Sequence, residues 1–309
     1  ETAAEAEAET QQQLNCYADV CEQDLAIPVV KGRKTDKEKF AGAEATYTIE
    51  AMMKDRKALQ SGTSHYFGDK FSRAYDVTFT GRDNKLQYPF QTSWGSTTRL
   101  IGACIMTHSD NNGLVLPPAV APIQVAVVPI AQHKPGVLDA AHELKQRLEA
   151  AGLRVKLDDS DQSPGWKFAQ YEMKGVPLRL EIGPRDIENG VVTVVRRDNG
   201  EKSVVKNEEL EGVIKCLLSD VHESMYRKAE AFRDSRIKEA HTLDELKKYL
   251  DEGNFVKAMW CGSQECELKV KELMQATIRI MPFDQTPIDD KCIADGSPAK
   301  KLVIFARAY

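Results

Sequence analysis

Four prolines interrupt the longest uncharged stretch of this chain, residues 113–132. They are Pro117, Pro118, Pro122 and Pro129. The stretch is long enough to cross a membrane, but so many prolines exclude a continuous spanning helix. We interpret residues 116–122 as a linker, and the β-branched run at 123–128 is typical of a strand covered on both faces. A new domain is therefore expected to begin near residue 123.

The composition excludes several classes of protein. The 309 residues are 42% hydrophobic and 29% charged, as in ordinary globular proteins, so disordered, collagen-like and disulfide-framework chains are excluded. The 42 Lys+Arg and 47 Asp+Glu give a net charge of −5, which excludes a wholesale basic nucleic-acid binder but allows a local RNA site. The first 15 residues carry no Lys or Arg, unlike a secretory or transit peptide, so the seven cysteines are expected to be reduced thiols in the cytoplasm.

The pattern of elements predicts three domains and a multidomain α+β and α/β fold class. Residues 1–122 begin with a helix over 1–25 and continue as antiparallel sheet with polar loops. In residues 123–221 strands alternate with helices, which favours a small α/β domain with a mostly parallel sheet. A long charged helix is expected over 208–240, and residues 222–309 form a third, smaller unit. Its strands are expected at 255–260, 276–283 and 302–306.

The most informative stretch is residues 91–102, QTSWGSTTRLIG, in which Arg99 interrupts small and apolar sequence. An arginine on a structured element is costly unless its guanidinium group has a partner. Its planar fork suits stacking on a purine or bidentate pairing with phosphate, and Gly95 lets a ligand approach the backbone closely. A structural salt bridge to a carboxylate is the alternative, and the residues alone do not decide between the two.

A second polar group surrounds Gly62 in residues 58–66, ALQSGTSHY. Its hydrogen-bonding side chains are Gln60, Ser61, Thr63, Ser64 and His65. We expect a turn here that builds the polar floor of a pocket, although a turn rich in glycine and serine often has no further role. It is not a Walker A loop, because no Gly-Lys-Ser/Thr follows at the right spacing. A single histidine such as His65 can equally be a satisfied core residue.

Further segments carry a resemblance to a known family. They are residues 32–42, 59–65, 92–99, 110–118, 163–168, 181–186 and 195–198. In this order they closely resemble prolyl-tRNA synthetases of the eukaryotic and archaeal type, and the resemblance covers essentially the whole chain. It implies part of a class II synthetase antiparallel-sheet catalytic domain in residues 1–122, an α/β anticodon-binding domain in 123–221, and a small α+β, zinc-binding-like C-terminal domain in 222–309.

The resemblance implies that residues 94–106 are motif 3 of a class II synthetase. Arg99 is then the catalytic residue that holds a bent ATP by its adenine and phosphate side. The other implied ATP contacts are Gln60, Thr63 and Thr97. The implied proline-binding residues are Phe40, His65, Ser93, Trp94 and Gly95. The implied chemistry is attack of the prolyl carboxylate on the α-phosphate, which gives prolyl-adenylate and releases pyrophosphate, then transfer of the prolyl group to the terminal ribose of the tRNA. Mg²⁺ is expected on the phosphates, and no protein nucleophile is needed.

Motifs 1 and 2 of the family are absent from this sequence, and by the resemblance they would precede residue 1. Motif 2 carries the phosphate-binding arginine and acidic residues that grip the prolyl nitrogen. The chain is therefore expected to hold half an active site and to act with the missing N-terminal part of the catalytic domain. The family is usually a homodimer through motif 1, so we expect a homodimer when the enzyme is complete.

The second domain resembles the anticodon-binding domain of the family. The implied anticodon-binding residues are Lys167, Phe168, Glu181, Arg185, Arg196 and Arg197. Carboxylates and guanidinium groups can read base edges, and an aromatic ring can stack on an unstacked base. For the two adjacent arginines the structural alternative is a solvated strand end.

Three cysteines of the third domain, Cys261, Cys266 and Cys292, can present three thiolates, whereas a structural zinc site needs four ligands. By the resemblance, a fourth cysteine belongs two positions after Cys292, where this chain has Ala294. A filled site would need a water, Asp295 or another group as the fourth ligand. Three reduced thiols are the alternative, and we expect substoichiometric zinc whose removal leaves the domain folded.

Taken together, the resemblance implies ATP-dependent ligation of L-proline to tRNA(Pro) through prolyl-adenylate. This chain would supply motif 3, part of the proline pocket and the anticodon-binding domain. The rival interpretation is a non-catalytic tRNA-binding or regulatory fragment of a synthetase.

Overall fold

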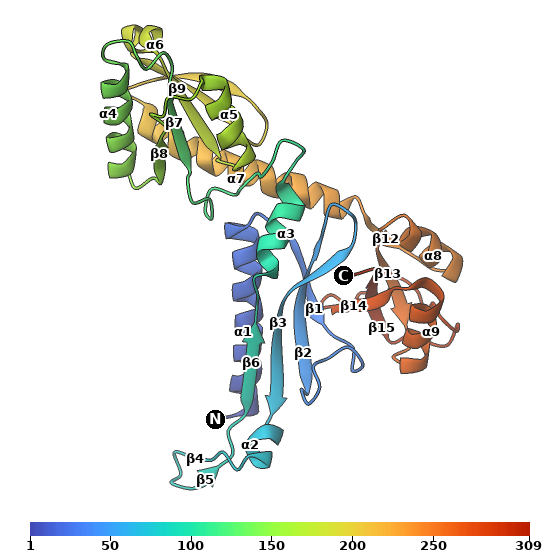
Figure 1. The fold of residues 1–309 in the computed structure, drawn as a ribbon. Coiled ribbons are helices and arrows are strands. Elements are labelled where there is room, and N and C mark those ends of the chain that lie inside the picture. The colour runs from blue at the N-terminus through green and yellow to red at the C-terminus, as the bar shows by residue number, and fades with distance from the viewer. The chain divides into compact units, whose positions relative to one another are not determined.

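The computed structural model describes all 309 residues, which form two compact units (Figure 1). Unit 1 contains Glu1–Gln23, Ile27–Ala103 and Glu230–Tyr309, and unit 2 contains Asp24–Ala26 and Cys104–Ala229. The last 80 residues thus belong to the same unit as Glu1–Gln23 and Ile27–Ala103. The division of the sequence into three domains stays a prediction. None of the helices combines the length and apolar character needed to cross a membrane.

An eight-stranded sheet forms unit 1, in the order β12-β13-β15-β14-β1-β2-β3-β6. Its strands are β1 (Val29–Arg33), β2 (Ala45–Met52), β3 (Ala58–Gly68), β6 (Gln91–Gly95), β12 (Ile237–Glu239), β13 (Phe255–Trp260), β14 (Thr277–Pro282) and β15 (Lys301–Ala306). All neighbours are antiparallel except β12 and β13. This agrees with the antiparallel sheet expected from the sequence. β6 is an edge strand that only β3 pairs with.

Helix α1 (Ala3–Asp19) lies along β3 and β6 (Figure 1) and continues as the π-helical turn η1 (Val20–Asp24). The hydroxyl of Ser64 in β3 donates to the Thr10 carbonyl of α1 at 2.8 Å. A Cβ atom on Gly62 would lie only 3.3 Å from the ring of Tyr17, so glycine lets helix and strand approach closely. Gly62 is therefore a packing residue inside a long strand, and the turn expected at residues 58–66 is wrong.

Other helices and a small hairpin complete unit 1. They are α2 (Lys70–Ala74), the two-residue strands β4 (Phe79–Thr80) and β5 (Leu86–Gln87), α8 (Leu243–Asp251) and α9 (Gln264–Met274). Helix α3 (Arg99–His108) begins in unit 1, directly after β6. The long charged helix α7 (Leu210–Asp234) ends earlier than the predicted residue 240, because the chain turns into β12 at Ile237.

A buried ion network joins β1, β2 and β14. Lys34, directly after β1, donates to Glu50 of β2 at 2.8 Å, and the Arg279 guanidinium of β14 also contacts the Glu50 carboxylate. The Glu50 side chain is 0% exposed and that of Lys34 is 3% exposed. Burial lowers the pKa of Lys34 against the pull of its carboxylate partner. Two segments far apart in the sequence are thus held to one carboxylate.

Unit 2 contains a five-stranded sheet in the order β11-β10-β9-β7-β8. Its strands are β7 (Val125–Pro129), β8 (Val155–Leu157), β9 (Leu178–Ile182), β10 (Val191–Arg196) and β11 (Lys202–Lys206), and its further helices are α4 (Val137–Ala150), α5 (Pro164–Met173) and α6 (Pro184–Asn189). β7 is parallel to β8 and β9, whereas β10 and β11 add antiparallel pairs. The sheet is therefore mixed rather than mostly parallel.

The β-branched run at the start of unit 2 forms its central strand, and every residue of β7 is buried. Val125 and Val127 pack in the larger core with α4 and α7. Ala126 and Val128 pack on the other side against Tyr171 of α5. The predicted strand covered on both faces is thus confirmed.

The buried network predicts the cost of removing its carboxylate. Glu50→Gln leaves two buried cations without a counter-charge, and we expect the free energy of unfolding to fall by about 3–5 kcal/mol. Chemical unfolding in urea should therefore show a clearly lower midpoint.

Glu44→Gln is the matched control, because Glu44 pairs with Lys70 at 3.4 Å on the surface, where such a pair contributes about 0–1 kcal/mol. Equal urea midpoints for Glu50→Gln and Glu44→Gln would contradict the role of the network.

Candidate functional site

The register of three strands brings polar side chains to one face of the unit 1 sheet. Thr46 of β2 lies opposite His65 of β3, and His65 lies opposite Ser93 of β6. Thr63 of β3 lies opposite Gly95 of β6 in the same way. Directly paired residues of an antiparallel sheet project to the same face. This face is opposite to the one that α1 covers.

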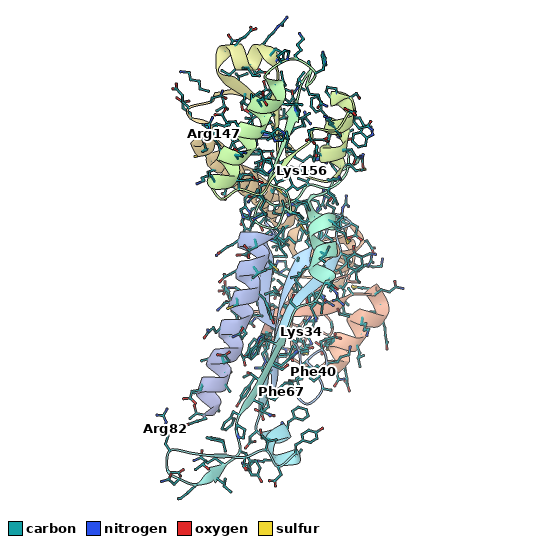
Figure 2. The ribbon with its side chains drawn as sticks, turned by 60° about the vertical axis from the view of Figure 1, so that its left-hand side comes forward. Lys34, Phe40, Phe67, Arg82, Arg147 and Lys156 are labelled. Atoms are coloured by element: carbon teal, nitrogen blue, oxygen red, sulfur yellow. The ribbon has the colours of Figure 1, made fainter.

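His65 is held by a hydroxyl group and an aromatic wall. Its Nδ1 and the Thr46 hydroxyl share a hydrogen bond of 3.0 Å, and burial lowers the pKa of the ring. The Phe40 ring lies 5.0 Å from the His65 ring and 5.7 Å from the ring of Phe67 (Figure 2). The Phe40 N–H also donates to the Thr46 hydroxyl. Phe40 is nevertheless 53% exposed, so the wall is open on one side.

Trp94 does not lie with the other residues predicted to bind proline. It pairs with Ser64, whose side chain bonds to α1, so the side chain of Trp94 projects to the α1 face. Ser93 and Gly95, one residue away on either side, project to the opposite face. The structure thus brings together Phe40, His65, Ser93 and Gly95 and leaves Trp94 outside.

Arg99 is the first residue of α3, close to the end of β6. Its Nη1 donates to the Gln60 carbonyl at 3.3 Å, and its N–H donates to the Thr97 hydroxyl at 3.2 Å. The guanidinium group has no carboxylate partner, so the salt bridge considered as an alternative is not formed. A Cβ on Gly95 would meet no atom within 4 Å, so the space before this strand end is open.

Unit 2 has a charged pocket of about 450 Å³ between the C-terminal end of α5 and the β10–β11 hairpin. Its charged lining includes Glu172, Arg179, Arg196, Arg197 and Lys202. The Arg179 guanidinium lies 4.0 Å above the ring of Phe168 and donates to Glu181 at 2.8 Å. The two form a flat cation and aromatic surface beside the pocket.

Two of the predicted anticodon residues are fixed by carboxylates. Arg197 donates two hydrogen bonds to Asp110 at 2.7 and 2.8 Å and a third to the Glu172 carbonyl, and its side chain is 6% exposed. Arg196 is paired with Asp198 in the same bidentate way. The alternative of a solvated strand end is therefore wrong for both arginines.

Lys167 is 1% exposed and lies inside unit 2. Its Nζ donates to the Asp158 carbonyl at 2.9 Å and to the Gln132 side chain at 3.0 Å. The lysine thus has buried partners and does not line the pocket. Arg185 is exposed in the first turn of α6 and is also absent from the pocket lining.

Sequence reasoning missed Glu172, Arg179 and Lys202, which line the pocket. The alternation of β9 carried a signal for Arg179, because Leu178 and Leu180 are buried and the residue between them projects away from the core. Lys202 gave no such signal, since β11 itself was not predicted.

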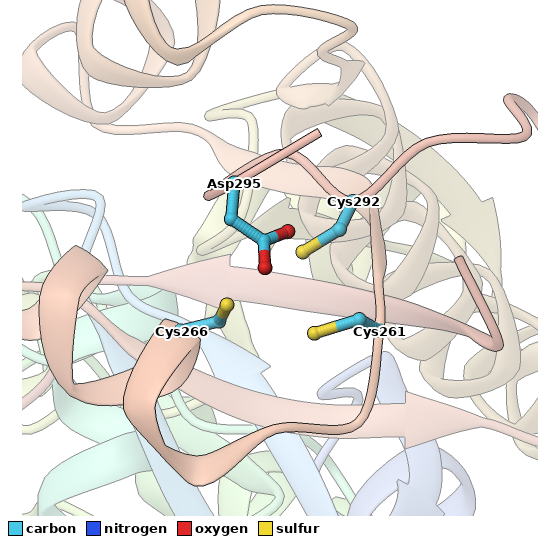
Figure 3. A group of neighbouring side chains, drawn as sticks. All are labelled: Cys261, Cys266, Cys292 and Asp295. Atoms are coloured by element: carbon cyan, nitrogen blue, oxygen red, sulfur yellow. The ribbon is translucent and has the colours of Figure 1, made fainter. Parts of the chain in front are cut away.

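The three cysteines of the C-terminal segment converge with Asp295 (Figure 3). The sulfur atoms of Cys261, Cys266 and Cys292 and a carboxylate oxygen of Asp295 all lie within 4.8 Å of one another. Three sulfur atoms and one oxygen at this spacing fit the ligand number and size of a tetrahedral zinc site. Ala294 offers no side-chain ligand, and its carbonyl accepts from Lys269 at 2.7 Å.

Thiol and carboxyl pKa values differ within this cluster. Burial raises the pKa of Cys266 and Cys292. For Cys261 burial is outweighed by hydrogen bonds, including one from the Ser263 N–H, and its pKa is lowered. The Ser297 hydroxyl and N–H hold the pKa of Asp295 well below its usual range. The Cys261 thiol and the Asp295 carboxyl group therefore favour the deprotonated, charged form that binds a metal ion.

Two family models match the chain. Residues 124–217 match the model described as "Anticodon binding domain" and residues 243–309 match "Prolyl-tRNA synthetase, C-terminal". The chain also aligns over all its residues with a protein named proline–tRNA ligase from Lachnospira eligens, at 58% identity. Over its whole length, the chain is therefore similar to proteins named proline–tRNA ligase.

Other relatives show the same similarity. A proline–tRNA ligase of Ruminiclostridium cellulolyticum is 57% identical over 309 residues, and a proline–tRNA ligase 2 of Bacillus cereus is 55% identical over 310 residues. Each alignment covers 100% of this chain but only 64 to 65% of the relative. The chain thus spans slightly less than two thirds of the length of these relatives.

The Arg197–Asp110 pair predicts a dependence of stability on acid. The Arg197 guanidinium lowers the pKa of Asp110 from 3.8 to about 2. A carboxyl whose pKa is lower in the folded state stabilises above its unfolded pKa and loses this contribution as pH falls. We expect the urea midpoint of the chain to fall between pH 3.8 and about 2, and less steeply in Asp110→Asn.

Asp161→Asn is the control, since Asp161 is exposed in the same unit and has no ion-pair partner. If the urea midpoint of Asp110→Asn falls with pH as steeply as that of the unchanged chain, the Arg197–Asp110 pair has no measurable role.

Proposed function

We propose that this chain takes part in ATP-dependent ligation of L-proline to tRNA(Pro) through prolyl-adenylate. The observation that supports this most strongly is the Arg99 guanidinium, which has no carboxylate partner and lies near the open strand end at Gly95, in a chain whose relatives are named proline–tRNA ligase. The chain would supply motif 3, part of the proline pocket and the anticodon-binding domain.

The role of Arg99 in this proposal is charge stabilisation. A guanidinium group without a carboxylate partner is free to pair with a phosphate or to stack on adenine. The Gln60 carbonyl and the Thr97 hydroxyl contact Arg99 and hold the start of α3, and Thr63 lies opposite Gly95 in the sheet. As the prolyl carboxylate attacks the α-phosphate, negative charge moves onto phosphate oxygens, where a fixed cation lowers the barrier.

The proline pocket in this proposal lies on the sheet face of His65 and Ser93. The aromatic rings of Phe40 and Phe67 suit the apolar pyrrolidine ring, and burial keeps His65 neutral, so it adds no positive charge next to the prolyl nitrogen. Gly95 leaves the space between this face and Arg99 open, so the amino acid carboxylate can reach the nucleotide.

In this proposal Mg²⁺ is bound to the phosphates of ATP and not to side chains of this chain. Mg²⁺ prefers carboxylate and phosphate oxygens, and the residues around Arg99 are hydroxyls, amides and a guanidinium group. The residues around Arg99 therefore offer Mg²⁺ no carboxylate ligand. When bound, it would neutralise charge on the phosphates.

We also propose that the unit 2 pocket binds the anticodon of tRNA(Pro). The stacked Arg179 and Phe168 provide a surface for an unpaired base, and Glu172 and Lys202 of the lining provide polar contacts for base edges. Glu181 lies outside the lining and holds the Arg179 guanidinium. The buried partners of Lys167 and the bidentate pairs of Arg196 and Arg197 favour a supporting role for these three residues.

The cysteine cluster is proposed to hold one structural Zn²⁺ through three thiolates and Asp295. The sequence left a water, Asp295 or another group as the fourth ligand, and the position of Asp295 beside the three thiols supports it as that donor. When bound, the ion would bridge β13, α9 and the segment after β14, and it would have no part in the chemistry.

A complete ligase would need more than this chain, and the unpaired edge of β6 next to Arg99 suits pairing with a strand of the missing catalytic part. By the family resemblance we propose a cytoplasmic homodimer for the complete enzyme. A non-catalytic tRNA-binding fragment remains the rival, and proline-dependent ATP–pyrophosphate exchange by the completed assembly distinguishes the two.

The role of Arg99 predicts a selective loss of activity. In an active ligase that contains this chain, Arg99→Ala should reduce ATP–pyrophosphate exchange by about 100-fold or more, because the cation at the developing charge is gone. Binding of tRNA(Pro), measured by filter binding, should be unchanged.

Arg82→Ala is the control, since Arg82 is 87% exposed at the β4–β5 turn. Loss of tRNA affinity with preserved exchange in Arg99→Ala would show that motif 3 has been misassigned.

The pocket in unit 2 predicts which cations read the anticodon. Arg179→Ala and Lys202→Ala should weaken binding of tRNA(Pro) by about 1–3 kcal/mol relative to a tRNA with an altered anticodon. The control Lys156→Ala removes the same charge from β8, at the opposite edge of the sheet, and should have a small effect on both tRNAs. If all three variants weaken both tRNAs equally, the pocket does not read bases.

The fourth donor predicts the metal content. Because Asp295 lies with the three thiols, we expect one zinc per purified chain by elemental analysis, in place of the substoichiometric zinc expected from three thiolates alone. Zinc binding should be about 10-fold to 100-fold weaker in Asp295→Ala, measured by competition with a chromophoric chelator. Asp284→Ala is a matched control, because Asp284 accepts the same pair of bonds from Thr286 that Asp295 accepts from Ser297. Equal zinc affinity in the two variants would remove Asp295 from the ligand set.

A further inference from the structure

A separate pocket of about 250 Å³ lies in unit 1 where the loop after β1 meets the start of α9. Its lining includes Arg33, Lys37, Trp260, Gln264, Glu267 and Lys301. None of these residues belongs to the sheet face of His65, to the unit 2 pocket or to the proposed zinc ligands. The functions proposed above therefore leave this pocket unexplained.

Glu267, which lines this pocket, carries an unsatisfied acceptor. The side chain belongs to a residue only 1% exposed, and its Oε1 accepts from the Thr35 hydroxyl at 3.0 Å. Its Oε2 is buried and has no hydrogen-bond partner. A buried carboxylate oxygen without a donor is costly, so a donor supplied by a ligand would stabilise this arrangement.

Lys37, which also lines the pocket, carries an unsatisfied donor. Its Nζ is buried without a hydrogen-bond partner, and Glu38, at 3.8 Å, lies beyond hydrogen-bond distance. Arg33 and Lys301 add two further positive charges to the lining. The first turn of the 11-residue helix α9 starts at Gln264 on the pocket wall, and a helix N-terminus also favours an anion.

The lining is thus complementary to a ligand that has a cationic group able to donate hydrogen bonds and also an anionic group. Its volume is smaller than the roughly 300–1,000 Å³ of pockets for drug-sized molecules, which excludes a nucleotide or a stretch of RNA. We propose that this pocket binds a free α-amino acid with a small side chain. The ammonium group donates to Glu267 Oε2, the carboxylate accepts from Lys37 Nζ, and the side chain lies near Trp260.

This inference goes beyond the proposed ligase function and does not depend on it. The test titrates L-alanine into the full chain and follows binding by ligand-observed NMR, with N-acetyl-L-alanine amide, which lacks both charges, as the ligand control. Glu267→Gln replaces the acceptor by a donor of the same shape, and Lys37→Met removes the partner of the carboxylate. Each should weaken binding by about tenfold or more.

Two further variants make the outcome specific. Glu265→Gln removes an exposed charge from the same turn of α9 and should bind L-alanine like the unchanged chain. His65→Ala alters the proposed proline pocket and should also leave this binding unchanged. If Glu267→Gln fails to fold, Lys37→Met alone carries the test. No saturable binding by the unchanged chain would overturn the proposal. So would binding by Glu267→Gln and Lys37→Met as tight as that of the unchanged chain, or loss of binding in His65→Ala.

Discussion

The carboxylate of Glu50 is the constraint on which the sheet of unit 1 depends. It accepts hydrogen bonds from Lys34, 16 residues away in sequence, and from Arg279, 229 residues away. Once these charges are out of water, they must remain together, because separating them would leave an unpaired ion in the core. The first strands of the unit, β1 and β2, are thereby fixed in one sheet with β14 from the C-terminal segment, and β1 and β14 pair directly beside the network.

The position of the candidate site follows from this sheet through strand register. Thr46, His65 and Ser93 share a face because they are paired across three strands, and a shift of one residue would turn each of them toward α1. Ser64, which bonds to the α1 backbone from the other face, helps to hold that register. Packing on one face of β3 therefore fixes the chemistry available on the other.

Local pattern was enough to predict most elements, such as the helix at α4 and the strands β7 and β13. The same alternation of strand residues would have separated Trp94 from Ser93 and Gly95, because neighbours in a strand project to opposite faces. The length of β3 was harder to predict. From the sequence Gly62 indicated a turn, whereas in the structure it lets the ring of Tyr17 pack closely on a continuous strand.

Contacts between distant residues could not be predicted from local pattern. Arg197 and Asp110 are 87 residues apart, and nothing in the sequence around either residue announces the other. The sequence named Asp295 only as one possible fourth ligand beside Cys292, because its distance from Cys261 and Cys266 depends on how the segment after β14 folds. Pairings of this kind depend on the tertiary structure that the strands create.

The edge strand β6 affects how the chain behaves in concentrated solution. Its outer backbone groups face no neighbouring strand, and its last three residues are exposed. An open edge accepts any extended segment of suitable length, including the same edge of a second molecule. Concentrated solutions of the chain on its own will therefore tend to associate edge to edge, and a partner strand on β6 will act as a solubilising cap.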